Sequence, residues 1–206
     1  MNKELLKDVP HIRYEDLAVT FCCLLRMDGQ GLGTVRITDE HMEAWGINEA
    51  ELLRQAKENS PRLLPYTFEN IFKVLAKLML KEMDDEKGNI DQELFKSIID
   101  NLQEEEENRY ANAMYVLTTD CGINGASCAF YDGVLETIYD DFGCGFYILP
   151  SSVNELILIP DTCAGLGEKE HLAELVCGVN SSEVPKQEVL SDRVYHYPED
   201  KFRIGF

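Results

Sequence analysis

The sequence predicts an α+β fold, in which helices pack on a mostly antiparallel sheet. Two observations predict this class. Runs rich in β-branched and aromatic residues lie between glycine-containing turn signals, and other segments repeat apolar residues at helical spacing after a capping residue. Strands precede helices in both halves of the chain. With 206 residues, 45% of them hydrophobic, the chain is long enough to bury a core.

Strands are expected to open the first half of the chain. Residues 16–27 (DLAVTFCCLLRM) form an apolar run rich in strand-forming residues. A turn signal follows at residues 28–31, because it contains two glycines beside polar residues. Residues 33–38 (GTVRIT) then alternate as a second strand.

Two capped helices are predicted after these strands. Thr38 or Asp39 caps a short helix that Gly46 ends. Asn48 caps a longer helix, and this helix is expected to stop before Pro61, because the residue before a proline avoids helical backbone angles.

The middle of the chain is predicted to be helical. Residues 66–83 carry an apolar stripe at helical spacing, made of Phe68, Ile71, Phe72, Leu75, Leu78 and Met79. A second helix is expected at about residues 91–108, after a polar segment that misses the calcium-loop pattern. Its acidic end, Glu104 to Glu107, is interpreted as solvated, because adjacent carboxylates point in different directions around a helix.

The second half is expected to begin again with strands. The predicted elements are strands at 113–119 and 126–130, a helix at 132–143 closed by Gly143, strands at 146–150 and 154–160, a helix at about 167–179, and a C-terminal hairpin around Pro198 to Asp200. The order strand, turn, strand and capped helix at 16–46 therefore recurs at 113–143. This recurrence suggests two β-β-α units that contribute to one sheet. The chain is interpreted as one domain, 1–206, with sub-lobes 1–65 and 110–206 and a helical insert 66–109.

The stretch FYILPSSVNELILIPD, residues 146–161, predicts two adjacent antiparallel strands in the centre of the sheet. Both runs are rich in isoleucine, leucine and aromatic residues, and the residues between them match a common hairpin loop length. Pro150 is placed in the turn, where its missing N–H costs no ladder bond. Ser151 and Asn154 are expected to bond the turn's backbone. The side chains expected to face the core are Ile148, Leu156 and Leu158.

The same loop is the candidate binding loop, through Ser151, Ser152, Asn154 and Glu155. A serine hydroxyl needs a neighbouring base to become nucleophilic, and Asn154 cannot take its proton. A nucleophile elbow also needs glycines around the serine, between a strand and a helix, whereas this loop joins two strands. No catalytic residue is therefore predicted, and a structural turn is favoured over a binding loop.

No other residues predict a catalytic, metal or cofactor site. The histidines at positions 11, 41, 171 and 196 are scattered, with no pair at metal-binding spacing. Residues 161–167 (DTCAGLG) faintly resemble a phosphate-binding loop, but they contain no lysine and Asp161 would repel phosphate. Trp45, the sole tryptophan, is interpreted as a core anchor.

Charge and cysteine content bear on partners and compartment. The net charge is −19, and no lysine or arginine cluster is present, so neither nucleic acid nor an anionic membrane surface is an expected partner. Excess negative charge favours basic partners. The seven cysteines, an odd number in a chain that starts without a signal-peptide pattern, predict reduced thiols and a cytoplasmic protein. Cys121 and Cys144, beside glycines, are expected to be more exposed than Cys22 and Cys23.

Several long motifs carry a family resemblance. They are ELLKDVPHIRYEDLAV, TDEHMEAWGINEAELLRQAKENSPRLLP, MYVLT, YILPSSVNELILIPD and VLSDRVYHY, which together cover nearly the whole chain. The chain resembles one uncharacterised family of anaerobic gut Firmicutes, a domain of unknown function. Members of that family usually carry a further N-terminal region, and their loop commonly has histidine where Asn154 stands here. The resemblance implies no activity.

The favoured function is that of a non-enzymatic, acidic module that binds another protein or a second copy of itself. An exposed edge of the first strand would invite such pairing. The alternative is an enzyme of unrecognised type, hydrolase-like, that uses the 150–155 loop with a histidine brought in by the fold. A small-molecule sensor or an antitoxin-like partner is the third and weakest hypothesis.

Overall fold

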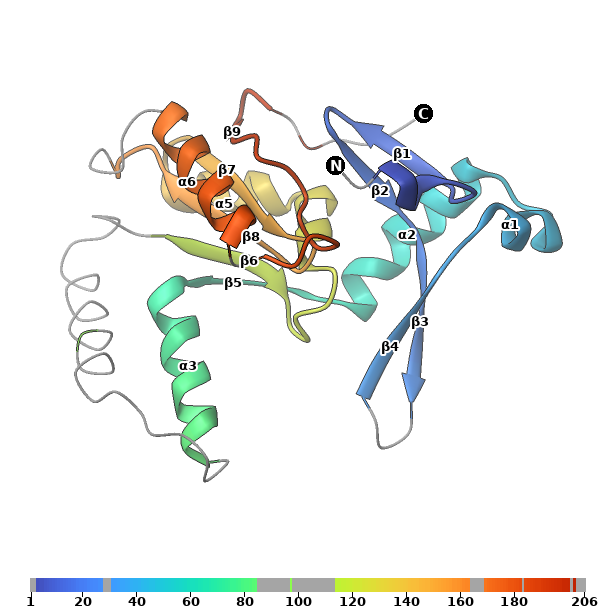
Figure 1. Ribbon diagram of the computed structural model, residues 1–206, viewed down its shortest axis with the longest axis horizontal. Coiled ribbons are helices and arrows are strands. Elements are labelled where there is room, and N and C mark those ends of the chain that lie inside the picture. The colour runs from blue at the N-terminus through green and yellow to red at the C-terminus, as the bar shows by residue number, and fades with distance from the viewer. Residues whose placement is uncertain are drawn as a thin grey trace.

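The computed structural model describes residues 3–27, 31–84, 97, 114–163, 169–182, 184–200 and 202. Its helices and antiparallel sheets confirm the α+β class (Figure 1). Within these residues the strands form two two-stranded sheets and one five-stranded sheet. The helix predicted at about 91–108, with its acidic end, lies outside the described residues except for position 97.

The helices and strands follow one another in a fixed order, in which η marks a short 3-10 helix. They are η1 (Lys3–Leu6), β1 (His11–Tyr14), β2 (Leu17–Thr20), β3 (Cys22–Met27), β4 (Gly31–Arg36), α1 (Asp39–Trp45), α2 (Glu49–Leu63), β5 (Tyr66–Asn70), α3 (Ile71–Asp84), β6 (Tyr115–Thr119), η2 (Gly125–Phe130), α5 (Val134–Phe142), β7 (Phe146–Ser152), β8 (Glu155–Pro160), α6 (Lys169–Ser182) and β9 (Tyr195–Tyr197). No helix among the described residues is long and apolar enough to span a membrane.

The five-stranded sheet, in the order β5-β6-β8-β7-β9, carries the main core. Ile138 of α5 and Ile148 of β7 share one cluster of buried residues. Leu172 of α6 and Leu149 of β7 share another. Because neighbouring side chains on a strand point to opposite faces, α5 and α6 cover opposite faces of this sheet.

The predicted strand pair in the centre of the sheet is confirmed. β7 and β8 are antiparallel neighbours, Ile148 stands opposite Leu158, and each strand has a further strand on its other side. Ile148, Leu156 and Leu158 are buried, as predicted. These three side chains belong to the cluster that α5 covers.

The turn between these strands is tighter than predicted. Only Val153 and Asn154 connect Ser152 to its cross-strand partner Glu155. Pro150 lies inside β7 and not in the turn, at a register shift in the pairing with β8. A β-bulge leaves one residue out of the ladder, so the missing N–H of a proline is tolerated there.

The N-terminal strands depart from the predicted single run at 16–27. β1 and β2 form a hairpin of their own, which the sequence pattern missed, and β3 pairs with β4. The run divides at Phe21, which is buried and whose carbonyl accepts a hydrogen bond from the Ile37 amide at 2.9 Å. Among the described strands β3 and β4 pair only with each other, so the two halves do not build one sheet.

The predicted strand at 126–130 is wrong. These residues form η2, in which Ser127 and Tyr131 donate backbone bonds to Asn124 and Cys128. Local bonds therefore satisfy the amides that a strand would pair with a neighbour. The second half lacks the predicted β-β-α unit for this reason.

The predicted helix at 66–83 is wrong in its first five residues. Tyr66 to Asn70 form β5, and Phe68 stands opposite Leu117 of β6. The Asn70 side chain then accepts a bond from the Phe72 amide at 2.7 Å, at the start of α3. The segment predicted as a helical insert, residues 66–109, therefore begins with a strand of the five-stranded sheet.

The capped helices α1 and α2 begin where predicted. Thr38 and Asn48 are the N-terminal caps, and Gly46 ends α1 in the left-handed conformation with φ of 65°. α2 does not stop before Pro61 but continues through it to Leu63. The last turn tolerates the proline, which lacks only the one N–H that would have bonded back along the helix.

An aromatic cluster packs the β1–β2 hairpin against the C-terminal part of the chain. The Tyr14 ring lies 5.3 Å from Phe130 and 4.9 Å from Phe202, measured between ring centroids. Phe202 in turn lies 5.2 Å from Tyr195 of β9. β9 itself pairs with β7 at the edge of the sheet. The tail contributes this strand and a turn at Pro198 to Asp200, where the hairpin was predicted, while most of the hairpin's second strand lies outside the described part.

Candidate functional site

The 150–155 loop is bound to two neighbouring segments. The Asn154 Oδ1 atom accepts a hydrogen bond from the Asn124 amide at 3.2 Å, and its Nδ2 atom donates to Glu188 at 3.4 Å. The buried Ser152 hydroxyl accepts from the Asn154 amide at 3.1 Å. Among the described residues it is therefore Ser152, and not Ser151, that bonds the turn's backbone, while the Asn154 side chain bonds other loops.

Backbone groups of the turn are engaged as well. The Asn154 carbonyl accepts from the Thr118 hydroxyl at 2.6 Å, and the Val153 carbonyl accepts from the Ala126 amide at 3.2 Å. The Val153 amide donates to the Glu188 carbonyl at 3.0 Å. Ser151 and Glu155 are half-buried. These contacts position the loop on the molecule, and it lines neither of the two concavities described below.

The histidine nearest to this loop along the sheet is His196, at the opposite end of β7. His196 pairs with Tyr147, and Ser152 lies five residues further along β7, roughly 16 Å away at strand spacing. The His196 ring is held by its own partner, since Nε2 lies 2.9 Å from Asp161. The fold therefore brings together His196 and Asp161, not His196 and the loop serines.

Gly145 makes room for the His196–Asp161 pair. A Cβ atom on Gly145 would stand 2.4 Å from the Asp161 carboxylate and 3.2 Å from the His196 ring. The other imidazole nitrogen of His196, Nδ1, lies 3.6 Å from Glu199. Both ring nitrogens thus face carboxylates, and no hydroxyl or thiol nucleophile contacts them in the described residues.

The other histidines have local contacts. His41 belongs to the N-terminal cap of α1, as its Nδ1 atom accepts from the Thr38 amide at 3.0 Å. His11 Nδ1 lies 2.8 Å from the Val9 carbonyl, and His171 is exposed on α6. Among the described residues, no three His, Cys, Asp or Glu side chains are grouped closely enough to hold a metal ion. Residues 164–168 of the glycine-containing segment lie outside the described part.

The cysteine exposures differ from the prediction. Cys121 is exposed and Cys144 is half-buried, but so are Cys22 and Cys23 respectively, and it is Cys128 and Cys163 that are buried. Partial desolvation by the surrounding protein raises the pKa of the Cys22 thiol although the residue keeps exposed surface, and burial raises the pKa of Cys128 to about 12. A thiol with a raised pKa is a poor nucleophile near neutral pH, so neither is set up for catalysis.

A cleft of about 400 Å³ lies between α2 and the start of α5. Lys57 and Asp132 line it and approach within 3.7 Å. This separation exceeds a hydrogen bond and Asp132 is largely exposed, so the two groups form a long ion pair at the surface.

Asp16 forms a polar contact between the β1–β2 turn and the C-terminal part of the chain. Its carboxylate accepts bonds from the hydroxyls of Ser191 and Tyr195, both fully buried. Burial acts to raise the pKa of Asp16, but the hydrogen bonds from Ser191 and Tyr195 outweigh it and hold the pKa below its ordinary value. Burial likewise raises the pKa of Tyr195, helped by the Asp16 charge.

The β3–β4 ribbon extends away from the five-stranded sheet, on the same side as α3 (Figure 1). Cys23 stands opposite Val35, and Leu25 stands opposite Gly33. Residues that face each other across an antiparallel pair share a side of the ribbon, as do alternate residues along a strand. Cys23, Leu25 and Val35 therefore form one apolar stripe.

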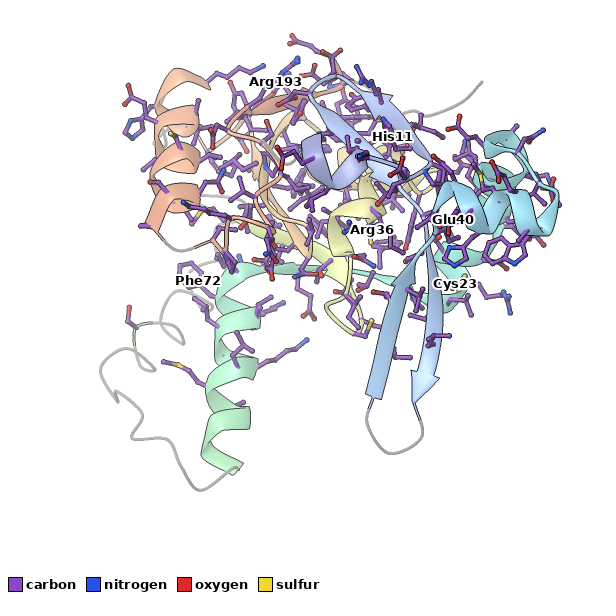
Figure 2. The ribbon with its side chains drawn as sticks, turned by 45° about the vertical axis from the view of Figure 1, so that its right-hand side comes forward. His11, Cys23, Arg36, Glu40, Phe72 and Arg193 are labelled. Carbon is purple, nitrogen blue, oxygen red and sulfur yellow. The ribbon has the colours of Figure 1, made fainter. Side chains whose placement is uncertain are left out.

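This stripe continues outward from the N-terminal core. Cys23 packs against the cluster around Phe21 and Ile37, while Leu25 and Val35 are 47% and 44% exposed. Figure 2 shows Cys23 near the base of the ribbon and Arg36 close to the point where the ribbon joins the rest of the molecule. The alternation along the two strands could have revealed the stripe, but not that β3 and β4 pair with no other described strand.

Trp45 is not a core anchor. It is 49% exposed, and its ring stacks on His41 with centroids 5.5 Å apart and planes 18° apart. No residue of α1 is buried. On its other flank, α1 borders an open concavity of about 570 Å³ shared with the start of α2. A seven-residue helix with three carboxylates has too little apolar surface to bury an indole.

Comparison with known proteins identifies a family. The model described as "Family of unknown function (DUF5688)" matches residues 1–199. No curated protein and no solved structure matches the chain. The expected resemblance to a domain of unknown function is thereby confirmed.

Proposed function

The chain belongs to the family of unknown function DUF5688, and we propose that it is a cytoplasmic protein-interaction module that self-associates through the β3–β4 ribbon. One observation carries the proposal. The ribbon exposes the apolar side chains of Leu25 and Val35 on one face, and in the described residues no third strand pairs with either of its outer edges.

Strand pairing is the contact that this ribbon fits best. A two-stranded sheet is only marginally stable alone, and three or more strands with an apolar face are needed for independent stability. Unpaired edges offer free N–H and C=O groups to another strand. Two ribbons joined edge to edge would form a four-stranded sheet, with a twofold axis that brings Leu25 of each copy to the same face.

The charge distribution favours the ribbon as the place of contact between copies. With a net charge of −19, two copies repel each other over most of their surfaces. The strands of the ribbon contain Arg26 and Arg36 and no carboxylate. Contact through the ribbon therefore brings together strands that carry no carboxylate.

The cytoplasmic part of the proposal rests on the thiols. All seven cysteines are free of disulfide bonds, including the exposed Cys22, Cys121 and Cys177. Exposed free thiols suit a reducing compartment. The hydrolase-like alternative at residues 150–155 has no such support, because Ser152 and Asn154 bond neighbouring backbone and side chains.

Light scattering coupled to size-exclusion chromatography tests the proposal. The wild-type mass should rise from monomer to dimer as the protein concentration increases. The double variant Leu25→Glu/Val35→Glu should stay monomeric, because carboxylates on the stripe would face each other across the dimer. The control is Leu63→Glu, which changes a side chain of equal exposure, 47%, on α2 and should dimerise as the wild type does.

Either of two results would overturn the proposal. A wild-type protein that stays monomeric at high concentration would overturn self-association, and so would a double variant that dimerises normally. Circular dichroism of the variants checks folding, which should be retained because Leu25 and Val35 are exposed.

A further inference from the structure

We propose that the exposed side of Trp45 is a docking site for an arginine-bearing segment of a basic partner protein. The site lies on α1 and does not depend on self-association through the ribbon. Trp45 is 49% exposed, although large aromatic side chains usually gain stability by burial. Tryptophan is enriched among the residues that dominate protein–protein binding energies.

The indole is held in place before any partner binds. Trp45 stacks on His41, whose Nδ1 atom accepts from the Thr38 amide and lies 3.0 Å from the Thr38 hydroxyl. Thr38 is the N-terminal cap of α1, so the stack rests on the fixed end of a helix. Because little side-chain freedom remains to be lost, a partner that stacks on the indole gives up less binding energy to ordering.

The segment that carries Trp45 is acidic, although Arg36 and Arg54 lie at its two ends. Residues 37–53 contain Asp39, Glu40, Glu43, Glu49 and Glu51, and neither lysine nor arginine. Of these carboxylates only Glu51 forms an ion pair with a residue that the structure describes, namely its helix neighbour Arg54. Glu40, labelled in Figure 2, lies on α1 near the point where the β3–β4 ribbon joins the rest of the molecule.

These charges act at the indole. The seven residues of α1 span only about 10 Å, so its carboxylates lie within roughly one Debye length of Trp45 at physiological salt. The concavity of about 570 Å³ that borders α1 is itself lined by Asp39, Glu43 and Glu49. The concavity lies on the flank of α1 away from the Trp45–His41 stack, so a second cationic side chain of the same segment reaches it around the end of the helix, past Gly46.

Arginine matches this surface better than lysine does. A guanidinium group is planar, stacks on aromatic faces and donates paired hydrogen bonds to carboxylates. An ammonium group is compact and strongly hydrated, and it gains less from stacking. The pairing of one exposed indole with unpaired carboxylates therefore selects arginine-bearing segments among basic partners.

The sole tryptophan makes the site directly observable. Emission from Trp45 reports on this site alone, because the chain has no other tryptophan. The probe is a short blocked peptide of alternating arginine and glycine, compared with peptides in which lysine or the neutral analogue citrulline replaces arginine. We expect a saturable emission change with the arginine peptide, binding weaker by roughly threefold or more with lysine, and no binding with citrulline.

Variants of the protein separate the contribution of the indole to binding from that of the protein's negative charge. Binding of a dye-labelled arginine peptide should weaken roughly fivefold or more in Trp45→Ala, because the stacking energy is lost. Glu40→Gln/Glu43→Gln should also weaken it, whereas Asp120→Asn/Asp140→Asn, with the same net charge and with exposed carboxylates elsewhere, should bind as the wild type does. The Leu25→Glu/Val35→Glu variant should bind the peptide normally.

Three results would overturn the proposal. They are an unchanged Trp45 emission at saturating peptide, equal affinity of wild type and Trp45→Ala, and equal weakening by the two charge-neutralising pairs. Because the readout is peptide binding and not oligomeric mass, failure here is distinguishable from failure of ribbon-mediated self-association.

Discussion

Gly125 lies directly against the backbone carbonyl oxygen of Asn154, so that a Cβ atom built on Gly125 would stand 2.1 Å from this oxygen. The same atom would stand 2.7 Å from the Thr118 Cα. Both contacts are with backbone atoms, which cannot move aside as a flexible side chain can. The start of η2, the end of β6 and the β7–β8 turn are therefore packed together at a position that only glycine fits.

Replacing this glycine should destabilise the protein. Gly125→Ala should lower the free energy of unfolding by about 1–3 kcal/mol, because the added methyl group forces backbone atoms apart. Chemical denaturation measures the loss. The control is Gly178→Ala in α6, where a Cβ atom would meet nothing within 4 Å and where alanine favours the helix. Equal stability of Gly125→Ala and wild type would contradict the packing described here.

The Asn154 side chain should contribute measurable stability. In Asn154→Ala, the Asn124 amide and the Glu188 carboxylate each lose a partner, so we expect a loss of about 1–2 kcal/mol. Asn59→Ala is the matched control, because its amide bonds only the exposed side chains of Gln55 and Arg62 on the same helix. Denaturation of both variants side by side measures the difference, and equal losses would contradict the proposed role of Asn154.

The bond between Tyr195 and Asp16 should give a pH-dependent effect. The pKa of Asp16 in the folded protein is below its ordinary value of 3.8, so its stabilising contribution is present above that value and is lost as pH falls through the folded-state pKa. Tyr195→Phe removes one of the bonds that lower this pKa. Its destabilisation, about 1–2 kcal/mol near pH 7, should therefore shrink at pH values well below 4.

Denaturation at a series of pH values measures this effect. Tyr139→Phe is the control, because the hydroxyls that bond Asp16 come from Ser191 and Tyr195 and not from Tyr139. A Tyr195→Phe penalty that stays constant from pH 7 into the acid range would show that the charge of Asp16 is not involved.

Trp45 should matter little for stability. Trp45→Ala should cost no more than about 1 kcal/mol, since the side chain is half exposed, whereas truncating the fully buried Phe146 to alanine should cost about 3–5 kcal/mol. Thermal denaturation distinguishes these values. A loss from Trp45→Ala as large as that from Phe146→Ala would restore the core-anchor interpretation of this residue.

Local patterns predicted much of this fold. The apolar runs at 146–149 and 155–159 specify the central strand pair, because alternation in both runs points Ile148 and Leu158 to one face. Capping chemistry likewise located the starts of α1 and α2 at Thr38 and Asn48. These features depend on interactions between residues close in sequence, which a single sequence displays directly.

The errors share a physical cause, which is contact between distant segments. Residues 66–70 have helical spacing, yet pairing with β6 makes them a strand. Residues 126–130 are apolar like a strand, yet Gly125 fits under the β7–β8 turn and η2 forms there. The exposure of Trp45 and of Leu25 also depends on which elements do not cover them, and no local pattern encodes that.

Hydrogen–deuterium exchange of the β3–β4 ribbon tests ribbon-mediated self-association most directly. In a monomer, the backbone N–H groups on the outer edges of residues 22–27 and 31–36 are open to solvent. In an edge-to-edge dimer, the N–H groups on the joined edge form hydrogen bonds to the other copy and exchange more slowly. Exchange is measured at low and high protein concentration, with β7 and β8 as the internal reference. We expect exchange of the ribbon to slow as concentration rises, while Leu25→Glu/Val35→Glu shows no such slowing. Ribbon exchange that is equally fast at both concentrations would contradict the account.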